Sequence, residues 1–357
     1  MPATLATARA RAALSRSLRQ GLERLGYLEV ETPIAVPLAG QEPHLRPFET
    51  VFTPDLPVAA GGIVGARRLH LHTSPEYAMK RLLAREGFGR IYQLARVFRD
   101  GEVTRSHNPE FTLLEFYAAP GSAETIMADL EALVAEAATA LRGTPDAPSR
   151  NGHGRGQKGA PLDLRPPFER LTCQEAFVRY AGFDPLALPE AAALRQAART
   201  VGVHPAVDSN WDDTFTQLLL EKVEPCLGLS TPTFLTEYPA SQAALSRLSA
   251  KDPRVAERFE LYAAGLELAN GFSELNDEAE QRARLREEQE LRRSLEREVF
   301  PLDERFLAAL PLMPDAGGVA VGVDRLLMLL TGAKSIADVL LFPAAEEYGA
   351  ARSAGRG

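Results

Sequence analysis

The sequence FRDGEVTRSHNPEFTLLEFYAA at residues 98–119 joins a charged loop to an Asn-Pro break and then to a strand pattern. Successive side chains of a strand point to opposite faces. One face of this strand therefore carries an aromatic ring, a carboxylate and a phenol in a row, within the set Phe111, Leu113, Glu115 and Tyr117. Such a face is typical of a binding surface, although a solvated face with one cross-strand pair would show the same alternation.

Arg99 ends the strand pattern RIYQLARVFR just before this loop. An Arg at the end of a strand is usually a surface charge. The loop that follows, however, also contains Arg105, His107 and Asn108. Guanidinium groups donate paired hydrogen bonds to phosphate oxygens, so the loop is suited to fold over a triphosphate.

The composition limits the classes of protein to which the chain can belong. The chain has 357 residues, 45% hydrophobic and 25% charged, as soluble globular proteins do. It has no apolar run of about 18 residues and no secretory signal pattern, so we expect a cytoplasmic protein without a membrane span. Cys173 and Cys226 lack metal-ligand spacing and are expected to be reduced thiols. The net charge of −8 argues against a surface that wraps nucleic acid, although it allows a local basic groove.

Helix and strand patterns follow one another irregularly, without regular βαβ alternation. Helical patterns cover residues 5–25, 74–87, 122–141, 172–182, 188–201, 212–222 and 278–298. Strand patterns cover residues 26–33, 67–73, 90–99, 110–118 and 233–239, with a hairpin at 257–272. Together they predict one α+β domain at residues 1–343, built around a largely antiparallel sheet. We expect the Gly- and Pro-rich insertion at about 143–161 to be mobile and the tail at 344–357 to be disordered.

The hairpin ERFELYAAGLELANGF brings two carboxylates together. A turn at Ala264 and Gly265 sets residue 262 opposite 267 and residue 260 opposite 269, so that Glu260 and Glu267 are diagonal neighbours on one face. Carboxylates this close repel each other unless a cation lies between them, and Mg²⁺ bound by carboxylates and phosphates fits this need. A helix through the same segment would also place both on one face, solvated and inert.

Glu274 lies farther along the same strand, after Asn270 and Gly271. Simple alternation places Glu274 and Glu267 on opposite faces of the sheet. Both can serve one site only if a β-bulge near Gly271 reverses the alternation, because a bulge inserts one unpaired residue into a strand.

The segment GGVAVGVDRLLMLLTG joins a strand of small residues to a helix at Gly322, with Arg325 in the first turn of the helix. Glycine allows a ligand to approach the backbone closely, and an early Arg adds positive charge to the helix N-terminus. The spacing fits neither a P-loop nor a Rossmann motif. A packed core helix with a surface Arg would give the same pattern.

Taken together, these segments resemble the three signature motifs of class II aminoacyl-tRNA synthetases. GYLEVETP resembles motif 1, FRDGEVTRSHNPEF resembles motif 2 and GVAVGVDRLLML resembles motif 3. HTSPEYAMKRLL, HNPEFTLLEFY and ELANGFSELND are similar to the lysine subgroup. The resemblance runs from about residue 8 to residue 343 and implies the catalytic domain of that family, an antiparallel sheet flanked by helices.

Lysyl-tRNA synthetases carry an N-terminal OB-fold that reads the anticodon, and the motif 1 helix here begins almost at Met1. The chain therefore resembles the freestanding paralogues that use ATP and Mg²⁺ to attach (R)-β-lysine to a lysine side chain of elongation factor P. Ala320 agrees, because the tRNA synthetases typically have Gly there and these ligases Ala. The resemblance also implies a homodimer through motif 1, including Pro33, and no stable tRNA binding.

The resemblance implies a role for each candidate residue. Arg99 would hold the α-phosphate, Phe111 would stack on adenine and Arg325 would hold the γ-phosphate, with the two arginines as catalytic residues. The rest of the nucleotide site would comprise Asp100, Gly101, Glu102, His107, Asn108, Glu267, Leu268 and Gly322. Glu260 and Glu267 would bind Mg²⁺. The amino acid site would comprise Ser74, Pro75, Glu76, Glu115, Tyr117, Asn270, Glu274 and Ala320.

Many relatives have Glu two residues after the motif 2 Arg, where this chain has Gly101. Either the loop shifts by one residue, so that Glu102 takes that place, or the backbone of Asp100 and Gly101 makes the adenine contacts.

Two other functions remain open at this point. The chain could be a truncated lysyl-tRNA synthetase-like enzyme that charges a tRNA or tRNA-like acceptor with lysine, although the expected absence of an anticodon domain argues against it. It could also be a catalytically idle regulatory relative, although the retained Arg99, Glu267 and Arg325 argue against that.

Overall fold

The computed structural model describes residues 4–54, 65–142 and 162–349 of the chain. The insertion predicted to be mobile, 143–161, lies outside the described residues, as does the end of the predicted tail. The start of that tail forms a one-turn helix, α10 (Ala344–Glu347), whose first residue is buried. None of the helices within the described ranges combines the length and the apolar character that crossing a membrane requires.

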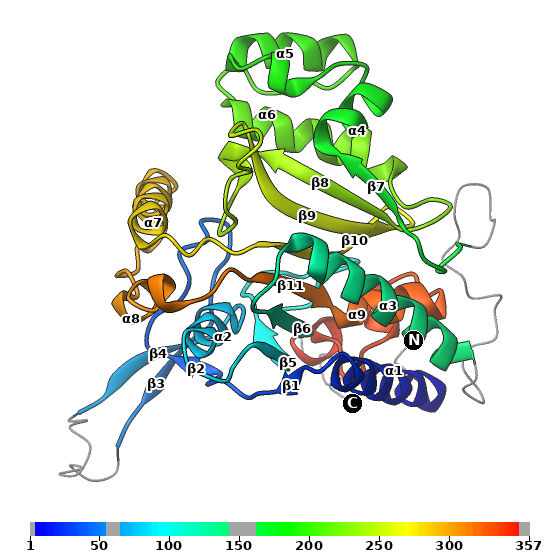
Figure 1. Ribbon diagram of the computed structural model, residues 1–357, viewed down its shortest axis with the longest axis vertical. Helices are drawn as coiled ribbons and strands as arrows, with labels where there is room; N and C mark the ends of the chain where they lie inside the picture. The colour runs from blue at the N-terminus through cyan, green and yellow to red at the C-terminus, as the bar shows by residue number, and fades with distance from the viewer. Residues whose placement is uncertain (1–3, 55–64, 143–161, 350–357) are drawn as a thin grey trace, which may run out of the picture.

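The centre of the fold is an eight-stranded sheet with the order β1-β5-β6-β11-β10-β9-β8-β7 (Figure 1). The strands, in that order, are Leu28–Glu29, Arg90–Phe98, Glu110–Ala118, Gly317–Gly322, Leu266–Ser273, Val255–Ala263, Thr233–Pro239 and Glu169–Thr172. All neighbours in the centre of the sheet pair antiparallel, and only the edge strands β1 and β7 pair parallel. The predicted α+β fold with a largely antiparallel sheet is confirmed.

A second sheet of three strands extends from one side of the molecule, at the lower left of Figure 1. Its strands, in spatial order, are β2 (Ala35–Val36), β4 (Arg67–Leu71) and β3 (Glu49–Phe52). The strand predicted at 26–33 is shorter than expected, because β1 pairs only through Leu28 and Glu29. Beyond this pair the chain leaves the large sheet to form β2.

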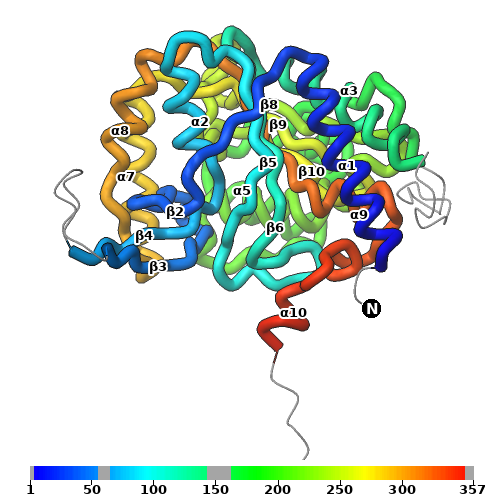
Figure 2. The backbone as a smooth tube through the Cα atoms, turned by 90° about the horizontal axis from the view of Figure 1, so that it is seen from below, coloured from blue at the N-terminus to red at the C-terminus, as the bar shows by residue number. Residues whose placement is uncertain are grey.

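Three helices cover one face of the large sheet: α1 (Leu5–Arg24), α3 (Ala123–Arg142) and α9 (Val323–Thr331). Figure 2 shows α1 running beside α3 and α9. The stripe of Leu14, Leu18 and Leu22 on α1 is buried in this layer, together with Leu114 and Phe116 of β6. This packing uses the apolar face of β6, as predicted, and leaves the opposite face for a site.

The remaining longer helices lie at the two sides of the sheet. Near the second sheet are α2 (Glu76–Leu83), α7 (Glu278–Ser294) and α8 (Glu304–Leu307). Over β7 and β8, at the top of Figure 1, are α4 (Cys173–Tyr180), α5 (Ala191–Thr200) and α6 (Trp211–Leu218). Each group has its own apolar cluster, around Met79 and Phe306 in the first and around Phe177 and Phe215 in the second.

The hairpin of β9 and β10 has the predicted turn but not the predicted register. Ala264 and Gly265 adopt positive φ values of 54° and 71°. A two-residue turn whose twist matches the twist of the flanking strands requires positive φ at both positions. The register then shifts between Glu267 and Ala269, so that Asn270, rather than residue 269, lies opposite Glu260. The extra residue is Leu268, so the bulge that a shared site requires lies at Leu268 rather than at Gly271. It nevertheless has the required effect, because it brings Glu267, Asn270 and Glu274 to one face of the sheet.

Asp324 joins the elements that carry the three motif-like segments. Its buried carboxylate accepts a hydrogen bond from the backbone N of Thr112 on β6 at 2.7 Å and pairs with Arg11 of α1. Arg11 also donates to the carbonyl oxygen of Val339 at 2.8 Å. A buried carboxylate with two partners fixes the start of α9 and hence the position of Arg325 beside it.

Candidate active site

A cavity of 360 Å³ opens on the face of the sheet that the α1, α3 and α9 layer leaves free. It is lined by most of the predicted site residues: Ser74, Glu76, Arg99, His107, Asn108, Phe111, Glu115, Tyr117, Glu267, Leu268, Asn270, Glu274, Ala320, Gly322 and Arg325. The strands β6, β10 and β11 form its floor. The structure therefore brings together residues from segments that are far apart in the sequence.

Arg99 dominates one end of the cavity. Its guanidinium carbon lies 5.1 Å from the centre of the Phe111 ring. Its Nε is buried and has no hydrogen-bond partner among the described residues. Since a buried donor without a partner is costly, this group is arranged to bind something that enters the cavity.

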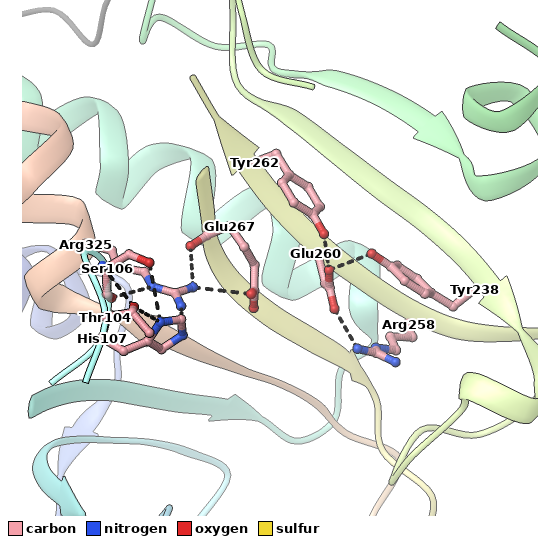
Figure 3. A network of polar contacts seen from close by, with 9 residues as sticks. All are labelled: Thr104, Ser106, His107, Tyr238, Arg258, Glu260, Tyr262, Glu267 and Arg325. Atoms are coloured by element: carbon pink, nitrogen blue, oxygen red, sulfur yellow. Dashed lines mark hydrogen bonds and ion pairs between the residues drawn. The ribbon is translucent and has the colours of Figure 1, made fainter. Parts of the chain in front are cut away.

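Arg325 is held at the same end by a network shown in Figure 3. Its Nη1 donates to the carbonyl oxygen of Glu267 at 2.9 Å, and its Nη2 donates to Nε2 of His107 at 2.6 Å. Because Nε2 accepts, the proton of neutral His107 is on Nδ1, which donates to Oγ1 of Thr104 at 2.7 Å. Burial, helped by Arg325 and Arg99, lowers the pKa of His107 to about 4. His107 therefore orients Arg325 as a neutral ring without adding a charge.

The two carboxylates of the hairpin lie on one face but have different surroundings (Figure 3). Glu260 accepts hydrogen bonds from the hydroxyl groups of Tyr238 and Tyr262, at 2.7 and 2.5 Å, and pairs with Arg258 at 2.6 Å. Glu267 lines the cavity, where burial and the charge of Glu260 raise its pKa. Within the described ranges, no group of three or more His, Cys, Asp or Glu side chains is arranged to hold a metal ion.

Another part of the cavity lining is acidic. Glu115 accepts hydrogen bonds from Oγ of Ser74 at 2.6 Å and from the hydroxyl of Tyr117 at 2.8 Å. Burial, with further repulsion from Glu76, raises the pKa of Glu115 to about 8. The Ser74 hydroxyl also accepts a hydrogen bond from the backbone N of Glu76, the first residue of α2, at 3.0 Å. One serine thus fixes both the start of α2 and the orientation of Glu115.

Two residues that complete this acidic part of the lining were not predicted. Lys80 of α2 places its Nζ 2.7 Å from Glu76 and 2.5 Å from Glu274. Gly318 of β11 has no room for a side chain, since a Cβ there would lie 2.1 Å from Oε1 of Glu274 and 2.4 Å from the Tyr117 ring. The spacing of Glu76 and Lys80 on one helix, and the small residues of the motif 3 strand, were the available sequence signals.

Two further carboxylates line the cavity beside Glu76, namely Glu42 and Glu288. Burial raises the pKa of Glu288 to about 8, with added repulsion from Glu42 and Glu76. Neither residue was predicted, because each lies in a segment without a recognisable pattern of chemistry.

Ala320 lies in the middle of the cavity floor. In the sheet register it is opposite Glu115 of β6 on one side and opposite Asn270 of β10 on the other. Its methyl group is therefore placed between the acidic part of the lining and the bulged strand, where it limits the space for a bound molecule.

Some predicted residues lie beside the cavity rather than on its lining. Among the described residues, Pro75, Asp100, Gly101, Glu102 and Glu260 are not part of that lining. Pro75 is the N-cap residue of α2. Asp100 turns to Arg46, at 3.2 Å, and Glu102 keeps a buried Oε2 without a hydrogen-bond partner in the described part of the chain.

Asn108 reaches the lining, but both ends of its amide are occupied. Nδ2 donates to the carbonyl oxygen of Glu110 at 2.7 Å, and Oδ1 accepts from the backbone N of Ala344 at 2.9 Å. In this arrangement Asn108 shapes the loop and holds the start of α10.

Comparison with known proteins defines the class. Residues 2–346 match the family model of tRNA synthetases class II (D, K and N). The chain belongs to this family, which confirms the predicted class II synthetase catalytic domain.

Its curated relatives narrow the resemblance to one branch. The Elongation factor P–(R)-beta-lysine ligase of Proteus mirabilis is 41% identical over 344 residues, which cover 96% of each chain. Proteins of the same name from Salmonella typhi and Salmonella enteritidis PT4 are 41% identical over 335 residues, or 93% of each chain. The similarity to the freestanding ligases, predicted from the motifs, is confirmed.

Proposed function

We propose that the chain is an ATP-dependent ligase that activates (R)-β-lysine as an aminoacyl-adenylate and transfers it to a lysine side chain of elongation factor P. The observation that carries this proposal is the composition of the cavity lining, which combines Arg99, whose Nε has no hydrogen-bond partner among the described residues, with a cluster of carboxylates. The relatives of that name, which match nearly the whole chain, support the choice of substrates.

In the activation step, a carboxylate oxygen of the amino acid attacks the α-phosphorus of ATP. A bond forms between that oxygen and phosphorus, the bond to the bridging oxygen breaks, and pyrophosphate leaves with the electron pair. Because the carboxylate is already ionised, the step needs positioning and charge stabilisation rather than a general base. Arg99 would stabilise the charge at the α-phosphate, and Arg325 would hold the γ-phosphate.

The acidic part of the lining would select a diamino acid. Glu76, Glu115 and Glu274 together carry three negative charges when ionised, and Lys80 compensates one of them. Two ammonium groups of one substrate balance the remaining charge. An amino acid with one amine would leave a buried carboxylate without a cation, which is costly in a site of low dielectric.

In the transfer step, the neutral amine of the acceptor lysine attacks the acyl carbon of the adenylate. The new C–N bond forms, the C–O bond to AMP breaks, and AMP leaves with the electron pair, while the nitrogen gives up one proton to solvent. Glu42 and Glu288 beside Glu76 would favour the approach of a cationic lysine side chain.

We propose that Mg²⁺ accompanies ATP. Glu267 and Glu260 lie on one face of the hairpin, and burial together with the charge of Glu260 raises the pKa of Glu267, as expected for a carboxylate that a divalent cation would stabilise. Glu267 would reach the ion from the cavity lining, with Glu260 behind it. Bound there, the ion would neutralise charge on the phosphates of ATP.

We also propose a homodimer through the motif 1 segment that contains Pro33. Two large apolar side chains are exposed here, Leu28 of this segment by 56% and Ile34, which directly follows it, by 44%. Exposed apolar side chains of this kind are often covered in an oligomer. Sedimentation or light scattering on the purified chain tests the proposal.

Pyrophosphate exchange into ATP tests the activation step. We expect exchange with (R)-β-lysine and weaker exchange with α-lysine. The control is a β-amino acid of similar length that lacks the distal amine, which should give no exchange. Equal exchange with and without the distal amine would contradict the diamino acid site, and no exchange with any amino acid would contradict the proposed activity.

A further inference from the structure

Lys80 is one of the most deeply buried charged side chains of the protein, with 1% of the residue exposed. It projects from the first turns of α2, and its Nζ lies between Oε1 of Glu76, at 2.7 Å, and Oε2 of Glu274, at 2.5 Å. The Phe272 ring lies below it, with the centroid 5.4 Å from Nζ. None of the roles that the resemblance implies for the cavity residues involves this ammonium group.

A buried ammonium group is stable only if nearby anions repay its loss of hydration. Burial alone lowers the pKa of Lys80, but the ion pairs with Glu274 and Glu76 outweigh burial, so that the net pKa is raised. Lys80 is therefore a permanent cation of the cavity wall near neutral pH.

The ion pairs leave one oxygen of each carboxylate for another partner. Lys80 engages Oε1 of Glu76 and Oε2 of Glu274. Oε1 of Glu274 is buried and accepts no hydrogen bond from any described residue. Gly318 keeps the space in front of this oxygen open, because a Cβ there would overlap it.

We propose that Lys80 is a positioning residue for amino acid recognition, which holds Glu76 and Glu274 together as carboxylates so that their free oxygens receive the ammonium groups of a diamino acid. The inference rests on the proposed function and adds a residue that does not itself touch the substrate. Lys80 thus compensates part of the negative charge of the acidic cluster and leaves the remainder for the ammonium groups of the substrate.

Lys80 also affects how the binding of the amino acid depends on pH. The charged and titratable groups that face Glu274 are Lys80 and Glu76 from α2 and Glu115 and Tyr117 from β6. Burial raises the pKa of Glu274, Lys80 opposes the rise, and Glu76 and Glu115 add to it. Without Lys80 the pKa of Glu274 rises further, so that Glu274 is protonated, and unable to accept an ammonium group, over a wider range of pH.

The test is Lys80→Met, which keeps an unbranched chain of similar length and removes the charge. Lys80→Gln is made in parallel, so that one uncharged variant can still be compared with the wild type if the other does not fold. Arg81→Met is the matched control, since it removes a charge from the next position of the same helix. For each variant, KM and kcat for (R)-β-lysine in pyrophosphate exchange are measured between about pH 6.5 and 9.5, with KM for ATP.

Below the pKa of a carboxylic acid, each unit of rise in that pKa lowers the ionised fraction about tenfold. We therefore expect KM for (R)-β-lysine to rise about tenfold or more near pH 7 in the Lys80 variants, and by much less near pH 9. KM for ATP should stay within about twofold, because the contacts of Lys80 in the described structure are with Glu76, Glu274 and Phe272 and not with Arg99 or Arg325. Arg81→Met should match the wild type.

A rise of KM that is equal at all pH values would show that Lys80 only supports packing, and it would overturn the proposal. An unchanged KM would overturn it as well. Failure of the proposed function is distinguishable, because the wild-type protein would then show no exchange with any amino acid.

Discussion

Replacing Arg99 with alanine should almost abolish activation while leaving the fold intact. Among the described residues the guanidinium forms no hydrogen bond or ion pair, and it makes a cation–π contact with Phe111 at 5.1 Å. Such contacts are worth about 0.5–1 kcal/mol at partly exposed sites. The backbone N of Arg99 donates to the carbonyl oxygen of Pro109 at 2.8 Å, and alanine keeps this bond. The cost to stability should therefore be small.

The cost to catalysis should be larger. The buried Nε of Arg99 lacks a partner in the described structure and faces the place proposed for the α-phosphate. Loss of one donor to developing negative charge raises the barrier by about 2.7–4 kcal/mol, or about 100- to 1,000-fold in rate. The structural and catalytic effects thus differ by enough to separate them.

The assay is pyrophosphate exchange with (R)-β-lysine, together with thermal unfolding. The control is Arg96→Ala, because Arg96 lies three residues earlier on β5 and pairs with Glu110 at 2.7 Å outside the cavity. We expect Arg96→Ala to retain exchange. Wild-type exchange rates in Arg99→Ala would refute the assignment of the nucleotide site, and equal losses in both variants would point to a general defect of β5.

Three further predictions concern the rest of the cavity. Ala320→Gly should improve use of α-lysine relative to β-lysine, since a pocket discriminates one methylene-sized change by about 1–3 kcal/mol; an unchanged ratio of exchange rates would mean that Ala320 only packs. Glu267→Gln should raise the Mg²⁺ concentration needed for half-maximal exchange, whereas an unaltered Mg²⁺ dependence would contradict metal binding at Glu267. The pKa of Glu115 is raised to about 8, and we propose that its ionised form binds the ammonium group, so kcat/KM for β-lysine should increase with pH and level off above that value. Glu115→Gln should flatten this profile, and a wild-type profile that falls between about pH 6 and 8 would contradict the sign of the effect.

Local sequence patterns correctly predicted features that repeat with a fixed period, such as the alternation of side chains along a strand. The alternation along β6 placed Phe111, Glu115 and Tyr117 on one face, and all three line the cavity. The turn at Ala264 and Gly265 was predicted from spacing alone, and both residues have the positive φ that it requires. Such features depend on a few neighbouring residues, so the sequence around them contains enough information.

Features that depend on distant partners were not predicted correctly. The bulge falls at Leu268 because the register of β10 is set by both of its neighbours in the sheet, β9 and β11. The spacing of Lys80 places it near Glu76, but its second partner, Glu274, directly follows β10 and is almost 200 positions later in the sequence. Glu260 likewise receives a hydrogen bond from Tyr238 of β8, which no local pattern relates to the hairpin.

The most direct test of the proposed function is the intact mass of elongation factor P after incubation with the purified chain, ATP and (R)-β-lysine. We predict that the mass of elongation factor P increases by one β-lysyl residue, located on a lysine side chain by fragmentation, and that lysine tRNA under the same conditions is not aminoacylated. An unmodified elongation factor P together with aminoacylated tRNA would contradict the account.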